Sequence, residues 1–103
     1  MKTISIPNGC ERIEELSLDN NIINELFLPP TLCAVDGIDG QNLEAYCFAP
    51  HLEDLSPFFE NNWIYIYVLP QYLDSYKSQA EAEGQDPSFI CTMPEEYLYY
   101  YDN

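Results

Sequence analysis

Basic residues are scarce in this chain of 103 residues, which has three lysines and arginines against 18 aspartates and glutamates. The formal net charge is −15 as a result. Binding a nucleic-acid backbone or an anionic membrane surface depends on lysine and arginine, so we expect neither nucleic acid nor membrane as a partner. An acidic field instead accelerates encounters with a basic protein, while the alternative is that the charge serves only solubility.

Long apolar runs are also missing from the sequence. No stretch approaches the roughly 18 apolar residues of a membrane span, and the opening MKTISIPNGC lacks the apolar run of a secretion signal. We expect a cytoplasmic protein, or a cell-surface or secreted one if a signal has been removed. Hydrophobic residues still make up 47% of the chain, so its length and composition indicate one folded domain and not a disordered acidic tail.

Catalytic motifs and cysteine-based metal motifs are lacking too. The four cysteines form no C-x-x-C pair, and the single histidine is His51. A zinc site is therefore not expected, and the cysteines are expected to be reduced and mostly buried. Cys47 lies four residues before His51, but a solvated turn histidine is the simpler interpretation of FAPHLEDL. We expect neither a nucleophilic pair nor any enzymatic activity.

Acidic groups give only a weak indication of metal binding. The segment DGIDGQN at 36–42 lacks the third acidic position and the closing glutamate of a calcium loop. Neighbours such as Glu14 and Glu15 point to opposite faces of a strand, so a doublet does not make a site. No metal or cofactor is expected, and a carboxylate-based metal-dependent enzyme remains as a minor alternative.

The strongest positive feature is an internal repeat. The template L-x-x-L-x-L recurs with starts at positions 13, 23, 32, 43, 52 and 63. Taken alternately, the starts give two series that each step by about 20 residues, at the short end of the leucine-rich-repeat range. Turn-forming residues fall between the half-units. The alternative is a small mixed sheet of hairpins with an average strand-plus-turn spacing.

Several segments carry a family resemblance. IEELSLDNNIINEL resembles the leucine-rich-repeat consensus, with Asn21 at its asparagine position, and ELFLPPTLCAVDGIDGQNL looks like the bacterial repeats of about 20 residues. ISIPNG and WIYIYVLPQYLDSYKSQ are similar to the first strand and the closing segment of BspA-like repeat proteins. Gly40, Glu60 and Pro57 depart from the pattern. The resemblance implies a scaffold for protein–protein recognition, often on bacterial surfaces.

The sequence therefore predicts a mainly β fold, an α/β solenoid of leucine-rich-repeat type. It would be a right-handed coil of about three 20-residue repeats with a C-terminal helical cap. The single domain, 1–103, would have repeat coils at 4–69, a capping helix at 70–84 and a tyrosine-rich tail at 85–103. Pro70 and Gly84 delimit the helix.

Strand alternation predicts which side chains face outward. In one series these are Glu15, Ser17 and Asp19, then Ala34, Asp36 and Ile38, then Asp54, Ser56 and Phe58. In the other they are Glu25, Phe27, Ala45, Cys47, Tyr65 and Tyr67. The tail is interpreted as an edge strand packed on the coils, as a docking or self-association strand, or as disorder. The partner-binding candidates are Glu15, Asp19, Asp36, Asp54, Phe58, Phe27, Tyr65, Tyr67, Tyr99 and Tyr101.

These observations predict a non-enzymatic protein–protein interaction module that binds through acidic and aromatic strand faces. The partner would be a protein, and the charge favours a basic one. An alternative is a small acidic inhibitor or immunity-type protein that neutralises a basic toxin or nuclease. Homo-oligomers are a further expectation, formed through an exposed strand edge or the tyrosine-rich tail.

Overall fold

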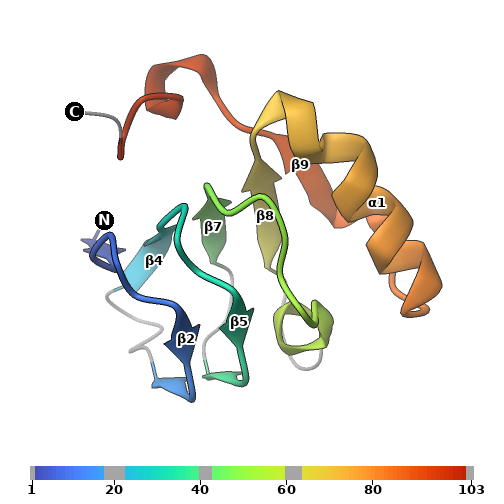
Figure 1. Cartoon of the computed structure of the whole chain (residues 1–103), viewed down its shortest axis with the longest axis horizontal. Coiled ribbons are helices and arrows are strands. Elements are labelled where there is room, and N and C mark those ends of the chain that lie inside the picture. The colour runs from blue at the N-terminus through green and yellow to red at the C-terminus, as the bar shows by residue number, and fades with distance from the viewer. Residues whose placement is uncertain (1, 18–22, 40–42, 60–63, 102–103) are drawn as a thin grey trace.

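A computed structural model of the chain describes residues 2–17, 23–39, 43–59 and 64–101. Its main sheet has five strands that are all parallel, in the order β1-β4-β7-β8-β9 (Figure 1). These strands are β1 (Lys2–Ser5), β4 (Ile23–Leu28), β7 (Glu44–Cys47), β8 (Tyr65–Val68) and β9 (Ile90–Thr92).

Shorter strands form two further parallel pairs beside the main sheet. They are β2 (Arg12–Ile13) with β5 (Ala34–Val35), and β3 (Leu16–Ser17) with β6 (Ile38–Asp39). The chain continues this layer after β7, where the backbone N–H of Glu53 donates to the carbonyl of Cys33 at 3.0 Å. There it forms the 3-10 helix η1 (Ser56–Phe58) in place of a strand.

Parallel neighbours in the main sheet are about 20 residues apart. Glu25 pairs with Glu44, and Glu44 pairs with Tyr65, so the paired residues are 19 and 21 positions apart. The crossovers that lead to β4, β7 and β8 pass through the layer of the short strands and η1, whereas the crossover from β8 to β9 passes through η2 and α1. The spacing read from the sequence thus appears as the offset between parallel strands.

The main core lies between the sheet and this layer of short strands. It is closed at one end by the 3-10 helix η2 (Pro70–Tyr72) and the helix α1 (Leu73–Ala82), whose Tyr76 and Ala80 are buried. Burying these side chains is worth about 25 cal/mol per Å² of apolar surface. The sheet residues of this core are Leu26, Leu28, Ala45, Cys47, Ile66, Val68 and Ile90.

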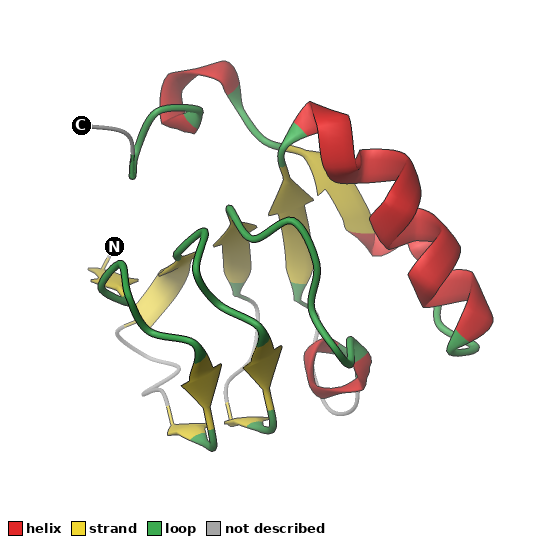
Figure 2. Ribbon diagram, viewed as in Figure 1, coloured by secondary structure: helices red, strands yellow, loops and turns green. Residues whose placement is uncertain are grey.

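The opposite face of the sheet is covered by the C-terminal segment. After β9 the chain forms the 3-10 helix η4 (Glu95–Tyr97) and returns past the strand ends toward the N-terminus (Figure 2). A second buried cluster forms there around Phe27, Tyr46, Phe48 and Met93. Both faces of the sheet are therefore covered within one small domain.

The predicted leucine-rich-repeat solenoid is wrong. The chain is instead a small, compact α/β domain with a five-stranded parallel sheet and one short α-helix. A coil would repeat the same strands in each turn, but the third turn has η1 in place of a strand, since Pro57 has no N–H for a sheet ladder. In addition, β8, α1 and β9 form a β-α-β unit, which extends the sheet beyond the repeats.

Two local predictions compare directly with the structure. The expected helix at 70–84 is present as η2 and α1, and Gly84 follows it with a φ of +78°, the left-handed conformation that glycine favours after a helix. In the tail, the strand is β9, which the short 3-10 helix η3 (Pro87–Phe89) precedes. The tyrosines that follow pack as helix and turn on the sheet.

Candidate functional site

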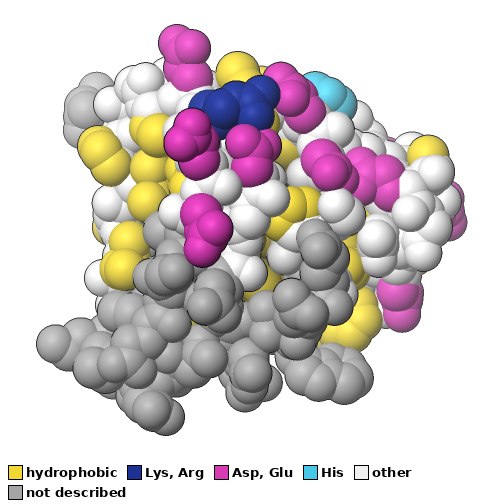
Figure 3. All heavy atoms as spheres, turned by 90° about the horizontal axis from the view of Figure 1, so that it is seen from below, with side chains coloured by type: hydrophobic (Ala, Val, Ile, Leu, Met, Phe, Trp, Pro, Cys, Tyr) yellow, Lys and Arg dark blue, Asp and Glu magenta, His cyan; other side chains and the backbone are white. Residues whose placement is uncertain are grey.

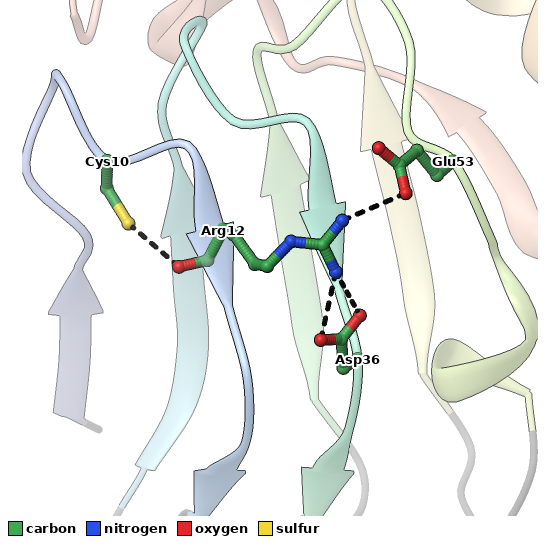
Figure 4. A network of polar contacts seen from close by, with 4 residues as sticks. All are labelled: Cys10, Arg12, Asp36 and Glu53. Carbon is green, nitrogen blue, oxygen red and sulfur yellow. Dashed lines mark hydrogen bonds and ion pairs between the residues drawn. The ribbon is translucent and has the colours of Figure 1, made fainter.

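An ion-paired cluster stands on the outer side of the short strands. The Arg12 guanidinium donates to the Asp36 carboxylate at 2.7 and 3.0 Å and to the Glu53 carboxylate at 3.1 Å (Figure 4). The three residues come from β2, from the residue after β5, and from the segment before η1. Each side chain is roughly half exposed, at 48%, 48% and 59%.

The backbone register explains why these side chains meet. Arg12 pairs with Ala34, and the N–H of Asp36 donates to the carbonyl of Ile13 at 2.8 Å. Ile13 packs against the core, so alternation turns Arg12 outward. The hydrogen bond and the charge of Asp36, and to a smaller extent those of Glu53, raise the pKa of the Arg12 guanidinium. Arg12 therefore stays charged.

We define the acidic face as Arg12, its partners Asp36 and Glu53, and two further carboxylates, those of Asp54, which follows Glu53 in the chain, and Glu15. Figure 3 shows acidic side chains gathered on this side of the molecule around one basic patch. All four carboxylates are exposed, and Glu15 lies beside Gly37. Hydrogen bonds from the N–H and hydroxyl of Ser56 lower the pKa of Asp54, so this group remains ionised at neutral pH.

Aromatic rings form a ladder across the opposite face of the main sheet. Phe27, Tyr46 and Tyr67 are neighbours in register on β4, β7 and β8. Their rings stack with centroid distances of 4.8 Å between Phe27 and Tyr46 and 5.0 Å between Tyr46 and Tyr67. We call this surface the aromatic face.

Two carboxylates receive the hydroxyl groups of this ladder. Glu44 accepts from Tyr67 at 2.9 Å and from Tyr46 at 3.4 Å, while Glu25 accepts from Tyr46 at 3.5 Å. Burial raises the pKa of Tyr67 to about 12, assisted by Glu44, and burial likewise raises the pKa of Tyr46. The hydroxyl groups therefore stay protonated and act as donors at physiological pH.

The C-terminal tyrosines cover the aromatic face. Tyr97 packs edge-on against Phe27 and Tyr46, at centroid distances of 5.3 and 4.9 Å, and Tyr100 stacks on Phe27 at 3.9 Å. The Tyr101 hydroxyl donates to the carbonyls of Ile6 at 2.7 Å and Phe27 at 3.0 Å. Contact with a partner through the ladder would require this segment to move.

The structure separates the predicted partner-binding residues into three groups. Glu15, Asp36 and Asp54 lie on the acidic face, and Asp19 is outside the described residues. The outward position expected for Phe58 is wrong, because it is 0% exposed in the main core. Phe27 does face away from the main core, but the C-terminal tyrosines cover it and leave it 2% exposed. The remaining candidates belong to the aromatic face and its cover: Tyr65 and Tyr99 are exposed, while Tyr67 and Tyr101 are partly buried.

Alternation also failed for the strand after Leu43. Ala45 and Cys47, which were expected outside, lie in the main core, while Tyr46 and Phe48 belong to the aromatic face. All residues from 45 to 49 are apolar, so the period of two cannot tell one face from the other.

The sequence did not predict the places of Arg12 and Glu53 in the acidic face or of Glu44 and Tyr97 at the aromatic face. The acidic doublet Glu53-Asp54 was the one available signal for Glu53. Arg12 meets its partners from 24 and 41 positions away, so no local pattern marks it. Glu44 and Tyr97 depend on the strand register and on the path of the tail, which no short motif encodes.

The described part of the chain contains no group of three histidine, cysteine or acidic side chains placed to hold a metal ion. His51 is exposed, and all four cysteines are free, with Cys33 exposed and Cys47 buried. No helix among the described residues is long and apolar enough to span a membrane. The expectations of no enzymatic activity and no cofactor stay predictions.

Comparisons with known proteins add no family to this picture. No protein-family model matches the chain, and neither a curated protein nor a solved structure matches it. The resemblance to leucine-rich-repeat and BspA-like proteins thus rests on the sequence segments alone. By its fold and surfaces, the protein is a small acidic α/β domain whose acidic face contains an ion-paired arginine.

Proposed function

We propose that this protein is a non-enzymatic interaction module that binds a basic protein through the acidic face. The observation that carries the proposal is the pairing of Arg12 with exposed Asp36 and Glu53, next to the exposed carboxylates of Glu15 beside Gly37 and Asp54 after Glu53. Four negative groups against one positive group give this face a net negative charge, which adds to the formal charge of −15 for the chain. Such a surface attracts lysine and arginine side chains and accelerates encounter.

Arg12 supports this proposal by holding two of the carboxylates in place. Its guanidinium bonds fix Asp36 and Glu53 at neighbouring positions, and Asp54 is held by the backbone N–H of Ser56 at 2.9 Å. Fixing these side chains before binding lowers the entropy lost on complex formation. Glu15 has no such tether among the described residues, so it provides the adaptable edge of the surface.

The aromatic face has a different place in this proposal. Its ladder is stacked internally and covered by the tail, so it supports the fold while the acidic face meets the partner. Self-association through the sheet edge at β1 or through the exposed Tyr99 stays a secondary proposal. The large negative charge opposes it, because like-charged copies repel.

An inhibitor or immunity-type protein that neutralises a basic toxin or nuclease is the second candidate. The observation that favours it is the net charge of −15 on a chain of only 103 residues. Such a pair would associate quickly at low salt and progressively more slowly as salt screens the attraction. Salt-insensitive binding through tyrosines would count against both candidates.

Binding of a proline-free, arginine-rich peptide, followed by NMR chemical-shift mapping, tests the proposal. We expect the largest shifts at the amides of Arg12, Asp36 and Glu53, and weaker binding at higher salt. Glu15→Lys should weaken binding several-fold more than Glu81→Lys, which makes the same charge change on α1. Equal effects of the two variants, or shifts centred on α1, would refute the acidic face as the binding surface.

A further inference from the structure

A groove of about 440 Å³ lies at the carboxyl ends of the central strands. Pro30 and Pro50 line it from the loops that follow β4 and β7, and Leu69 lines it from the residue after β8. In Figure 1 the arrowheads of β7 and β8 point toward the C-terminal segment that crosses above them. In open α/β sheets, crevices beyond the carboxyl ends of parallel strands are common binding positions.

The C-terminal segment supplies one wall of this groove. Leu98 and Tyr101 line it together with Tyr72 of η2, and Phe48 adds a further aromatic ring. A neighbouring hollow shares Leu69 and Leu98 with the groove and is also lined by Gln71. The residues that line the groove and those of the acidic face share no member.

The groove and the neighbouring hollow have few polar groups, and these can donate hydrogen bonds to the backbone carbonyls of a bound peptide. In the described part of the structure, the Tyr72 hydroxyl in the groove and the Gln71 side chain in the neighbouring hollow make no hydrogen bond. An extended peptide in the polyproline II conformation has no internal hydrogen bonds, so its carbonyls need donors. Proline rings pack against aromatic side chains, which is how aromatic-lined grooves bind such segments.

Charge determines which flanking residues the peptide carries. Asp74 follows Tyr72 by two residues in the first turn of α1, and the carbonyl of Glu95 accepts the N–H of Leu98 at 3.2 Å. The Asp74 and Glu95 side chains are both exposed. Asp74 is two residues after Tyr72 in the chain, and Glu95 is three residues before Leu98. No lysine or arginine lines the groove. The surroundings therefore favour lysine or arginine in the ligand.

We propose that this groove binds an extended, proline-containing segment of a partner protein that carries lysine or arginine beside its prolines. The proline rings occupy the space lined by the partly exposed Tyr72, Leu98 and Tyr101 side chains. The Tyr72 hydroxyl donates to a peptide carbonyl in the groove, and the Gln71 amide donates to one in the neighbouring hollow. This site is separate from the acidic face, and either proposal can fail without the other.

The test is an NMR titration of the intact protein with a synthetic peptide that alternates paired prolines with arginines. We expect shifts at the amides of Leu69, Tyr72 and Leu98, and about tenfold weaker binding when serine replaces each proline. Tyr72→Phe should weaken binding about fivefold, the effect of one lost hydrogen bond. Tyr65→Phe removes a hydroxyl from an exposed tyrosine outside the groove and should leave binding unchanged.

Several results would overturn this inference. They are equal binding of the proline and serine peptides, no groove shifts at millimolar peptide while the spectrum shows a folded protein, and equal effects of Tyr72→Phe and Tyr65→Phe. Loss of amide protection throughout the tail on binding would also overturn it, because Leu98 must stay in place as a wall. Shifts at Arg12 and Asp36 alone would support the acidic face and reject the groove.

Discussion

Replacing Tyr101 with phenylalanine should loosen the C-terminal segment without unfolding the sheet. The lost hydroxyl donates to the carbonyls of Ile6 and Phe27 at 2.7 and 3.0 Å, across a separation of 95 and 74 residues. The Phe27 carbonyl also accepts the N–H of Ile6 at 2.9 Å, so it stays satisfied after the change. The hydroxyl has one proton, which the two carbonyls share, so one net hydrogen bond is lost and the Ile6 carbonyl loses this donor, at a cost of about 1–1.5 kcal/mol.

Native-state hydrogen exchange measures this change directly. The opening equilibrium of the tail should rise about fivefold to tenfold, and the exchange of the Tyr100 and Leu98 amides should accelerate by the same factor. Tyr99→Phe is the matched control, because Tyr99 is 73% exposed and its hydroxyl makes no hydrogen bond in the described part of the chain. Equal acceleration in both variants, or acceleration in β7 but not in the tail, would refute the role assigned to Tyr101.

Three further predictions concern the core, alkaline stability and thiol reactivity. Tyr76→Phe removes a buried hydroxyl that donates to Ala49 at 2.7 Å, and urea unfolding should show a loss of about 1–2 kcal/mol. Because folding raises the pKa of Tyr67 to about 12, stability should fall as pH rises from about 10 through 12, and less so in Tyr67→Phe. Burial raises the pKa of Cys47 to about 11, so a thiol reagent should modify exposed Cys33 at once and Cys47 only on unfolding; rapid labelling of Cys47 in the folded state would contradict its burial.

The repeat spacing in the sequence predicted the offset of about 20 residues between neighbouring parallel strands. It did not predict the fold that these strands form. An internal repeat constrains which strands pair, as Glu25 and Glu44 do. The repeat does not determine whether every repeat unit forms the same strands. In the third unit, the segment that contains Pro57 forms the 3-10 helix η1 and not a strand. The addition of β9 and the return of the tail depend on long-range packing, which periodicity cannot report.

Part of the acidic face could be identified from the sequence, whereas the aromatic face was only partly anticipated. Glu15 and Asp36 are charged residues beside apolar ones, so their exposure was readable, whereas Ala34 and Ile38, which the same alternation placed outward, are buried. Tyr46 lies in an all-apolar run with no such contrast. Its direction follows from the carboxylates that accept its hydroxyl and from the small side chains of Ala45 and Cys47, which fit the core.

The association rate of matched charge-reversal variants with an arginine-rich peptide tests the proposed function most directly. Glu15→Lys and Glu81→Lys carry the same net charge and differ only in where the charge is reversed, because Glu81 lies on α1, outside both the acidic face and the groove. If the acidic face receives the basic partner, the first variant should associate about tenfold more slowly than the second in stopped-flow measurements at low salt, and the difference should shrink at high salt. Identical rates for the two variants at every salt concentration would contradict the account.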